Sequence, residues 1–291
     1  MRLTDDQGGC DLHTHTQASD GMNTPTENVE LAQARGLGAI AITDHDTVAG
    51  IAEALEAGRR WNVVVVPGVE ISTMASGKDI HILGYYVDYL DPDFLARLAE
   101  LRLTRDVRNE KILDKLRALG LELTMDEVIG GLGRSLEPDE SIGRPHIADA
   151  LVRKGYASTM RDAFDRYLAQ GAVAYAPQPR IHPREACEWI VAAGGVPVLA
   201  HPGLYGDDAL VREIIAEAAV KGIEVYHSDH DTTDAARYLA MAEEYDLIVT
   251  AGSDYHGVRQ GQVFHGDIGS KQLPMNVLAQ LKSARAASIE E

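Results

Sequence analysis

The feature that most constrains the fold of this chain is a repeated alternation of short apolar runs with helix-forming segments. The apolar runs are rich in β-branched residues and are typical of buried strands. Thr24-Pro25-Thr26-Glu27 is typical of a capped helix start that follows the first run. Strands that alternate with helices favour a parallel sheet, and seven strands fit an α/β barrel better than an open two-layer sandwich. The expected strands lie at 10–13, 39–42, 63–70, 80–86, 196–200, 222–226 and 247–251.

A helical insertion interrupts this alternation. A long helix is predicted to begin at Asp91-Pro92, and three shorter helical patterns follow before another strong strand pattern appears. A glycine-rich, charged loop covers residues 130–143 within this stretch. We therefore predict a first barrel segment at 1–90, a helical insertion at 91–175 and a second barrel segment at 176–291.

Composition excludes several classes of protein. The 291 residues are 45% hydrophobic and 25% charged, as in an ordinary globular chain, and their net charge of -18 disfavours binding to long nucleic acid or an anionic membrane. The N-terminus lacks the apolar core of a signal peptide, and no apolar run approaches the ~20 residues of a membrane span. Cys10 and Cys187 are too few for a disulfide framework. We expect a cytoplasmic protein with reduced thiols and no obligate protein partner.

Residues that commonly bind metals follow most of the expected strands. His13 and His15 stand two residues apart, so both imidazoles project from one face of an extended backbone. A lone pair of this kind is a weak signal, but the carboxyl ends of barrel strands converge on one mouth. Independent structural histidines would not be distributed in this way, so a metal site is favoured over a hydrogen-bonded polar core. The residues near these strand ends are His13, His15, Asp44, His45, Glu70, His201, His227, Asp254 and His256, and His81 lies early in the fourth strand.

The number of these residues exceeds the needs of a single ion. Six or seven imidazoles, together with Asp20, Glu70 and Asp254, would serve two or three divalent ions. Glu70 is the natural bridging ligand because a carboxylate has two oxygens to share.

As a set, these motifs resemble the polymerase and histidinol phosphatase (PHP) family of the amidohydrolase superfamily. The insertion, with Gly143-Arg144-Pro145-His146-Ile147-Ala148, resembles the branch of stand-alone bacterial phosphoesterases that act on nucleotides and RNA ends. This resemblance implies a distorted (βα)7 TIM-like barrel and a trinuclear metal centre, often with manganese. The motifs that carry it are His13-x-His15 with Asp20, Thr43-Asp44-His45-Asp46, Gly68-Val69-Glu70, Ala200-His201-Pro202 and Gly252-Ser253-Asp254-x-His256.

The resemblance also implies how the ligands are shared among three ions. Some relatives carry histidine where this chain has Asp20, and an oxygen ligand favours Mn²⁺ over Zn²⁺. Mn²⁺ is therefore expected, with Zn²⁺ or Fe²⁺ as alternatives. The implied sets are His13, His15, Glu70 and Asp254 for the first ion, Glu70, His81 and His256 for the second, and Asp20, His45 and His201 for the third.

The loop of the insertion is the candidate site for substrate recognition. Arg134, Ser135 and Arg144 fit a phosphate clamp, because guanidinium groups pair bidentately with phosphate, although each could instead be an ordinary solvated residue. Asp44 and His227 are further candidates for substrate contacts. The remaining histidines are expected to be surface or capping residues rather than ligands. These are His146, His182, His230 and His265.

The predicted activity is that of a metal-dependent phosphoesterase, in which bound metals lower the pKa of a water that attacks phosphorus. Glu70 and Asp254 would hold the ions, and His227 would orient the phosphate or protonate the leaving oxygen. Because the metals bind the phosphate being cleaved, extra arginines imply a second anionic group on a small nucleotide. We therefore expect removal of the 3′-phosphate from nucleoside 3′,5′-bisphosphates.

The sequence leaves four alternative functions open. They are a 5′–3′ exoribonuclease acting on short 5′-phosphorylated RNA, a histidinol-phosphate-like phosphatase, an amidohydrolase that cleaves an amide or lactone, and a non-catalytic binding module. A neutral amide would not need the arginine-containing loop. A binding module would be expected to have lost metal ligands, whereas all the matched ligands are present in this sequence.

Overall fold

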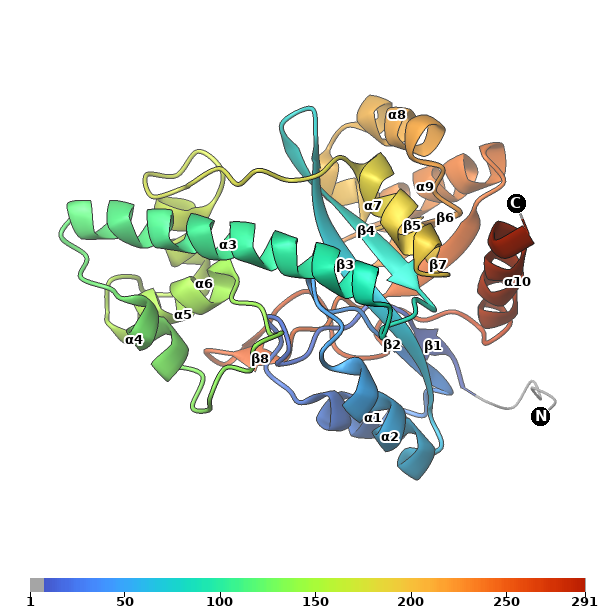
Figure 1. The fold of residues 1–291 in the computed structure, drawn as a ribbon, viewed down its shortest axis with the longest axis horizontal. Helices are drawn as coiled ribbons and strands as arrows, with labels where there is room; N and C mark the ends of the chain where they lie inside the picture. The colour runs from blue at the N-terminus through green and yellow to red at the C-terminus, as the bar shows by residue number, and fades with distance from the viewer. Residues whose placement is uncertain (1–7, 291) are drawn as a thin grey trace.

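The computed structural model describes residues 8–290, and its central element is a seven-stranded sheet with the strands in sequence order (Figure 1). Leu12 N donates a hydrogen bond to Ala251 O at 3.0 Å, which brings the first strand beside the last and nearly closes the sheet. The predicted distorted TIM-like barrel is confirmed. The strands are β1 (Cys10–Asp11), β2 (Ala39–Ile42), β3 (Val64–Ala75), β4 (Lys78–Tyr85), β5 (Val196–Leu199), β6 (Gly222–His227) and β7 (Ile248–Gly252).

Ser76-Gly77-Lys78 is typical of a hairpin turn, and β4 is accordingly the exception in an otherwise parallel sheet. β4 runs antiparallel to both β3 and β5, whereas the other neighbouring strand pairs in the sheet are parallel. Only Ser76 and Gly77 separate β3 from β4, both at positive φ, and so short a connection can join only antiparallel strands. The hairpin pairs His81 with Ser72, two residues beyond Glu70, and brings His81 to the expected rim.

Helices surround the sheet and supply most of the remaining core. The capping box predicted at Thr24 is present, because Thr24 Oγ1 accepts from Glu27 N at 3.1 Å and Glu27 Oε2 accepts from Thr24 N at 2.8 Å. Leucine, isoleucine and valine side chains from these helices bury against the strands. The barrel helices are α1 (Pro25–Ala34), α2 (Ile51–Trp61), α7 (Pro183–Ala192), η2 (Pro202–Tyr205), α8 (Asp208–Ala218), α9 (Thr232–Glu244) and α10 (Val277–Glu290).

The insertion forms a second group of helices at one side of the barrel (Figure 1). Its long helix α3 belongs to both parts, because Phe94 and Leu98 pack into the barrel cluster while Ile112 and Leu116 pack into the insertion cluster. A boundary at residue 91 therefore stays a prediction, since α3 contributes to the hydrophobic clusters of both parts. The helices are α3 (Pro92–Ala118), α4 (Met125–Gly130), α5 (Arg144–Arg153), α6 (Met160–Ala163) and the π-helical η1 (Phe164–Leu168).

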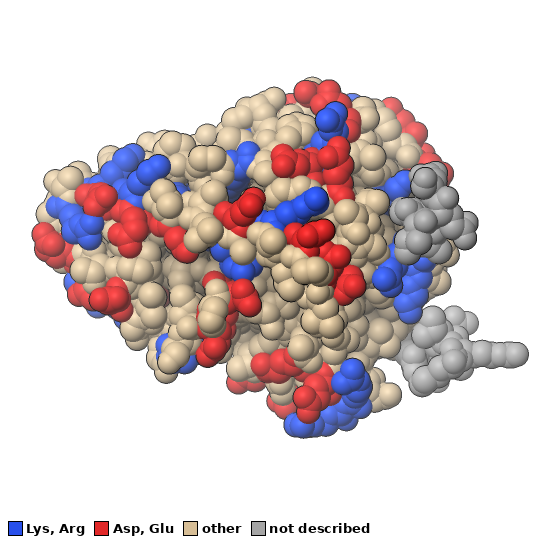
Figure 2. Space-filling model, viewed as in Figure 1, with Lys and Arg blue, Asp and Glu red and all other residues tan. Residues whose placement is uncertain are grey.

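A short hairpin after β7 was not predicted. It pairs β8 (Val258–Arg259) with β9 (Gln262–Val263), and strands of two residues carry too little periodicity to be recognised in sequence. No helix within residues 8–290 is long and apolar enough to span a bilayer. Acidic and basic side chains intermingle on the face shown in Figure 2.

Candidate active site

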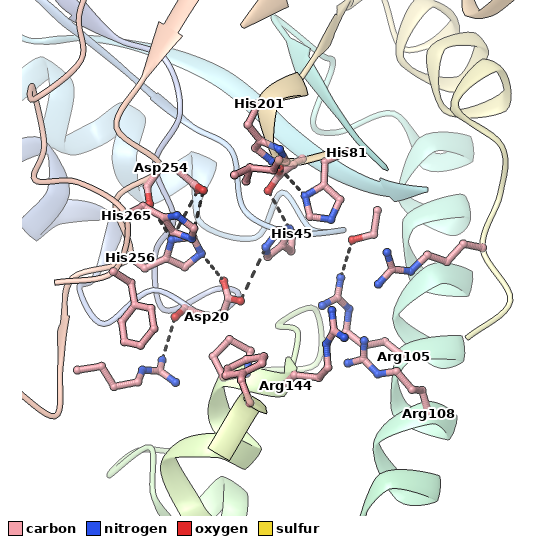
Figure 3. A pocket seen from close by; sticks show the side chains of 18 residues that line it. Asp20, His45, His81, Arg105, Arg108, Arg144, His201, Asp254, His256 and His265 are labelled. Carbon is pink, nitrogen blue, oxygen red and sulfur yellow. Dashed lines mark hydrogen bonds and ion pairs between the residues drawn. The ribbon is translucent and has the colours of Figure 1, made fainter. Parts of the chain in front are cut away.

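Most of the predicted metal ligands line one cavity at the mouth of the barrel (Figure 3), and His13 and His15 lie fully buried against Glu70, outside the lining. His13 and His15 follow β1, His45 follows β2, and His201 follows β5, so these side chains reach the mouth from the carboxyl ends of parallel strands. Glu70 lies within β3 and His81 within β4. Asp254 and His256 follow β7, and Asp254 takes a left-handed backbone conformation with φ of 54°.

Glu70 is the centre of this cluster and is only 1% exposed. Its Oε1 lies 2.8 Å from His81 Nδ1 and 3.0 Å from His201 Nε2. Its Oε2 lies 2.9 Å from His45 Nδ1, 3.3 Å from His15 Nε2 and 3.4 Å from the Nε2 atom of His13. Burial raises the pKa of Glu70, but the surrounding imidazoles outweigh it and hold that pKa well below its usual value. The carboxylate is therefore kept charged and can share its oxygens among several ions.

Several buried ligand atoms in the cluster have no hydrogen-bond partner. Such orphaned polar atoms are costly in a folded protein unless an ion or water completes them. Imidazole nitrogens and carboxylate oxygens are the donors that divalent transition metals prefer. The arrangement therefore fits a divalent metal centre. The unpartnered atoms are His13 Nε2, His15 Nδ1 and Nε2, His45 Nδ1, Glu70 Oε2, His201 Nδ1 and Asp254 Oδ1.

The geometry favours a partition of ligands that differs in part from the one implied by the resemblance. The first implied set holds together, since Asp254 Oδ1 lies 3.0 Å from His15 Nε2 and 3.3 Å from His13 Nε2. His256, however, lies with Asp20, 3.2 Å from its Oδ1, rather than with His81. His201 contacts Glu70 instead of Asp20. The second and third sets should therefore exchange His201 and His256, because spatial neighbours rather than motif order decide which ligands can share an ion.

Two further histidines contact Asp254 on its other oxygen. His227 Nε2 lies 3.2 Å from Asp254 Oδ2, and the ring is fully buried outside the cavity lining, so its role as a substrate contact stays a prediction. His265 lines the cavity instead, with Nε2 3.4 Å from Asp254 Oδ2 and Nδ1 against Asp229. Burial lowers the pKa of His265, but Asp254 and Asp229 outweigh it and raise this pKa to about 9. His265 is exposed, as expected, but it also lies at the edge of the cavity, where it contacts Asp254 and Asp229.

Glu224 on β6 is a functional candidate that the sequence did not reveal. It is completely buried, and its Oε1 and Oε2 lie 3.1 and 3.2 Å from His13 Nδ1. Its Oε2 also accepts a hydrogen bond from His201 N at 2.9 Å. A carboxylate behind a ligating histidine fixes the ring and leaves its other nitrogen for the metal. Glu224 therefore orients two candidate ligands at once.

The other three histidines bond to backbone, although His146 and His230 are buried rather than at the surface. His146 Nδ1 accepts from Gly143 N at 3.0 Å, and His182 Nδ1 accepts from Arg184 N at 3.3 Å. His230 donates through Nδ1 to Val225 O at 2.9 Å and accepts through Nε2 from the backbone of the η2 segment. The nitrogens engaged in this way are not available as metal ligands.

Four arginines form a second wall of the cavity, which we call the arginine cluster: Arg105 and Arg108 on α3, Arg144 at the start of α5 and Arg180 before α7 (Figure 3). Arg105 pairs with Asp46, while Arg144 and Arg180 share one carboxylate, Asp79, at 3.3 and 3.2 Å. Arg108 forms no ion pair within residues 8–290 and is 3% exposed. Burial and the neighbouring arginines hold its pKa well below the usual value. Four guanidinium groups thus share two carboxylates.

The structure separates the residues of the predicted clamp. Arg144 lines the cavity, but Arg134 pairs with Glu140 at 2.6 Å and donates to Gln17 O, so its guanidinium is already used to tie the loop to the barrel. Ser135 is exposed and lies outside the cavity lining. The Asp44 carboxylate accepts from Thr16 N, Thr16 Oγ1 and Ser19 Oγ at 2.7, 2.7 and 2.6 Å, and it also lies outside the lining. Asp44 therefore holds the loop that carries Thr16 and Ser19, and its contact with substrate stays a prediction.

Comparisons with known proteins agree with this geometry. The PHP domain family matches residues 11–176. The chain is 35% identical over 255 residues to 3′,5′-nucleoside bisphosphate phosphatase from Chromobacterium violaceum, covering 86% of this chain and 88% of that protein. It is 38% identical over 251 residues to the 5′-3′ exoribonuclease of Haemophilus influenzae, covering 84% and 89%. A solved structure from Bifidobacterium adolescentis, described as a metal-dependent phosphoesterase, superposes with a TM-score of 0.86 at 32% identity over 95% and 96% of the two chains.

Proposed function

This chain belongs to the PHP domain family and is a metal-dependent phosphoesterase, and from that premise we propose that it removes the 3′-phosphate of nucleoside 3′,5′-bisphosphates. The products are the nucleoside 5′-monophosphate and inorganic phosphate. The observation that carries the proposal is the arginine cluster, which shares the cavity with the metal ligands but has an excess of positive charge. A substrate with two separate phosphates supplies one group to each wall.

The predicted metal ligands form the first wall of the cavity, which we call the histidine–carboxylate wall. This wall would receive the phosphate that is cleaved. Three divalent ions, Mn²⁺ by preference, fit the ligands as His13, His15, Glu70 and Asp254, then Glu70, His81 and His201, then Asp20, His45 and His256. When bound, such ions supply an electrophile for phosphoryl oxygens and acidify water. Hydrolysis forms a bond from a water oxygen to phosphorus and breaks the bond to the ribose 3′-oxygen, which leaves as the alcohol.

Buried side chains next to the metal ligands keep these ligands in place during the reaction. Glu224 holds the ring of His13 and the backbone of His201, and His227 holds Asp254 from behind. His265, which lies beside Asp254 at the cavity wall, would contact an oxygen of the phosphate. These contacts preorganise charges where they are needed, which limits reorganisation when the substrate reacts.

The arginine cluster would hold the 5′-phosphate, which stays intact. Arg108 is buried among like charges without an ion-pair partner of its own within the described residues, so a phosphate dianion would relieve an existing repulsion as well as form charge-assisted bonds. Guanidinium groups match phosphate oxygens bidentately. Holding the second phosphate at a set distance also positions the scissile phosphate at the metal ligands.

The exoribonuclease relative supports a second candidate, stepwise cleavage of very short RNA from a 5′-phosphorylated end. The arginine cluster would again hold the 5′-phosphate, and the scissile group would be a diester. Histidinol phosphate and neutral amides fit less well, because neither offers a second phosphate to the arginine cluster.

Phosphate release and product analysis distinguish these candidates. Adenosine 3′,5′-bisphosphate, 5′-AMP, 3′-AMP, histidinol phosphate and a 5′-phosphorylated dinucleotide would be compared at equal Mn²⁺ concentration. We expect the bisphosphate to give the highest kcat/KM, with 5′-AMP as the product. Preference for a monophosphate contradicts the role of the arginine cluster, and preference for the dinucleotide moves the assignment to the exoribonuclease.

A further inference from the structure

The cavity has a third sector, which is apolar and has no role in the function proposed above. Its lining includes Phe164 and Phe264, which both pack against the hydrophobic cluster of the insertion. The sequence contains only three phenylalanines, and two of them reach this one cavity. Aromatic side chains that are partly exposed in a charged cavity are well suited to bind a flat, apolar group of a ligand.

The two phenyl rings come from different parts of the chain. Phe164 begins the π-helical turn η1 of the insertion, and such turns are frequent at functional sites. Phe264 follows the β8–β9 hairpin of the barrel and precedes His265, which lines the same cavity. The sector therefore lies where the insertion meets the last loop of the barrel.

Both rings are held in place before any ligand binds. Phe164 and Phe264 each pack on one side against the hydrophobic cluster of the insertion. The hairpin is fixed by Gln260 Nε2, which donates to Asp149 Oδ1 at 2.8 Å, and by Arg259, which donates to Asp20 O at 2.9 Å. Rings immobilised in this way lose little conformational entropy when a ligand binds.

We propose that Phe164 and Phe264 form a nucleobase subsite, on which the base of the nucleotide stacks. This inference rests on the proposed function, because it assigns the third part of a nucleoside bisphosphate to the third sector of the cavity. Phenyl rings stack on every base and read no base edge, so the subsite accepts all four bases and favours the larger purines. Phe164 and Phe264 thus select nucleotides over sugar phosphates.

Substitutions that remove the rings test the subsite. Phe164→Leu and Phe264→Leu keep an apolar side chain, and Phe164→Ala and Phe264→Ala remove it. Stacking on one ring corresponds to roughly 5- to 150-fold in affinity. We expect each leucine variant to raise the KM for adenosine 3′,5′-bisphosphate about 10-fold with kcat within twofold, while the KM for the base-free 1-deoxyribose 3,5-bisphosphate stays the same. Equal changes for the two substrates, or no change for either, would overturn the proposal.

The third phenylalanine supplies a matched control. Phe94 on α3 is buried in the barrel cluster away from the cavity lining, so Phe94→Leu should lower stability without separating the two substrates. A base-dependent effect of Phe94→Leu as large as that of the cavity variants would also overturn the subsite.

Calorimetric binding separates this inference from the reaction itself. Wild-type protein with Mn²⁺ should bind 5′-AMP at least 10-fold more tightly than ribose 5-phosphate, and the leucine variants should reduce that ratio. Equal or undetectable binding of the two ligands overturns stacking even if the bisphosphate is hydrolysed. If 5′-AMP still binds more tightly than ribose 5-phosphate but the bisphosphate is not hydrolysed, only the proposed reaction is refuted. Stacking of the base is then still supported.

Discussion

The histidine–carboxylate wall and the arginine cluster face the same cavity and are incomplete in opposite ways (Figure 3). The first has buried nitrogen and oxygen atoms with no hydrogen-bond partner, such as His15 Nε2 and Glu70 Oε2, and so needs cations. The second crowds four guanidinium groups around Asp46 and Asp79, and so needs an anion. The difference shows which part of a bisphosphate each wall would bind.

The largest effect is expected from Glu70→Gln in the first wall. An amide carries no charge and has one acceptor oxygen, so the shared ligand of the metal centre is lost. We expect kcat/KM to fall on the order of 10³-fold, because metal ions contribute several kcal/mol to such transition states. Elemental analysis should show a larger loss of bound ions than any single histidine substitution gives. Glu185→Gln, on the exposed face of α7, serves as the control, and full metal content in Glu70→Gln would contradict the central role of Glu70.

Glu224→Gln should weaken the first wall without removing a ligand. The amide is uncharged, and its nitrogen cannot accept from His13 Nδ1 as the carboxylate Oε1 does, whereas its oxygen can still accept from His201 N. Loss of such a supporting carboxylate typically costs 10- to 100-fold in metal affinity, so we expect a decrease of roughly 50-fold in a competitive chelator titration. Thr250→Val, a buried polar change on the neighbouring strand, should leave metal affinity intact. Equal losses in the two variants would assign the effect to general destabilisation.

Arg108→Met, in the arginine cluster, should raise the stability of the protein and weaken the binding of the substrate. Removing a buried charge from among like charges should raise the free energy of unfolding by about 1–2 kcal/mol. Loss of a charge-assisted bond should raise the KM for the bisphosphate about 30-fold, or ~2 kcal/mol. Thermal denaturation and steady-state kinetics measure the two effects, and metal content should not change.

Arg161→Met, an exposed change on α6, provides the baseline for both measurements on Arg108→Met. A loss of stability in Arg108→Met with an unchanged KM would show that Arg108 is an ordinary structural residue.

The smallest effect on substrate binding is expected from Arg134→Ala. Its guanidinium is committed to Glu140 and Gln17 O, so the KM for the bisphosphate should change less than threefold. Arg144→Ala should instead raise this KM on the order of 10-fold, because Arg144 lines the cavity. A larger KM effect from Arg134→Ala than from Arg144→Ala would restore the clamp predicted from sequence.

Local patterns in the sequence were sufficient to predict the barrel and the position of its chemistry. A β-branched run such as 39–42 identifies a strand, and a capping box such as that of Thr24 identifies a helix start, because both depend on neighbours close in sequence. His13, His45, His201 and Asp254 could be placed at the mouth of the barrel from sequence alone, because a barrel brings the ends of its parallel strands together.

Tertiary structure alone decided which of these residues meet, and which other residues join them. Glu224 is 211 residues from His13, and Arg180 reaches Arg108 from another segment of the chain, so no local motif links either pair. Arg134 and Arg144 have the same chemistry, but the packing of the chain places Arg134 against a barrel loop and Arg144 in the cavity lining. The sequence determined the residue types at the strand ends, whereas burial and the folding of the insertion onto the barrel determined their partners, because contacts between distant segments depend on the packing of the whole chain.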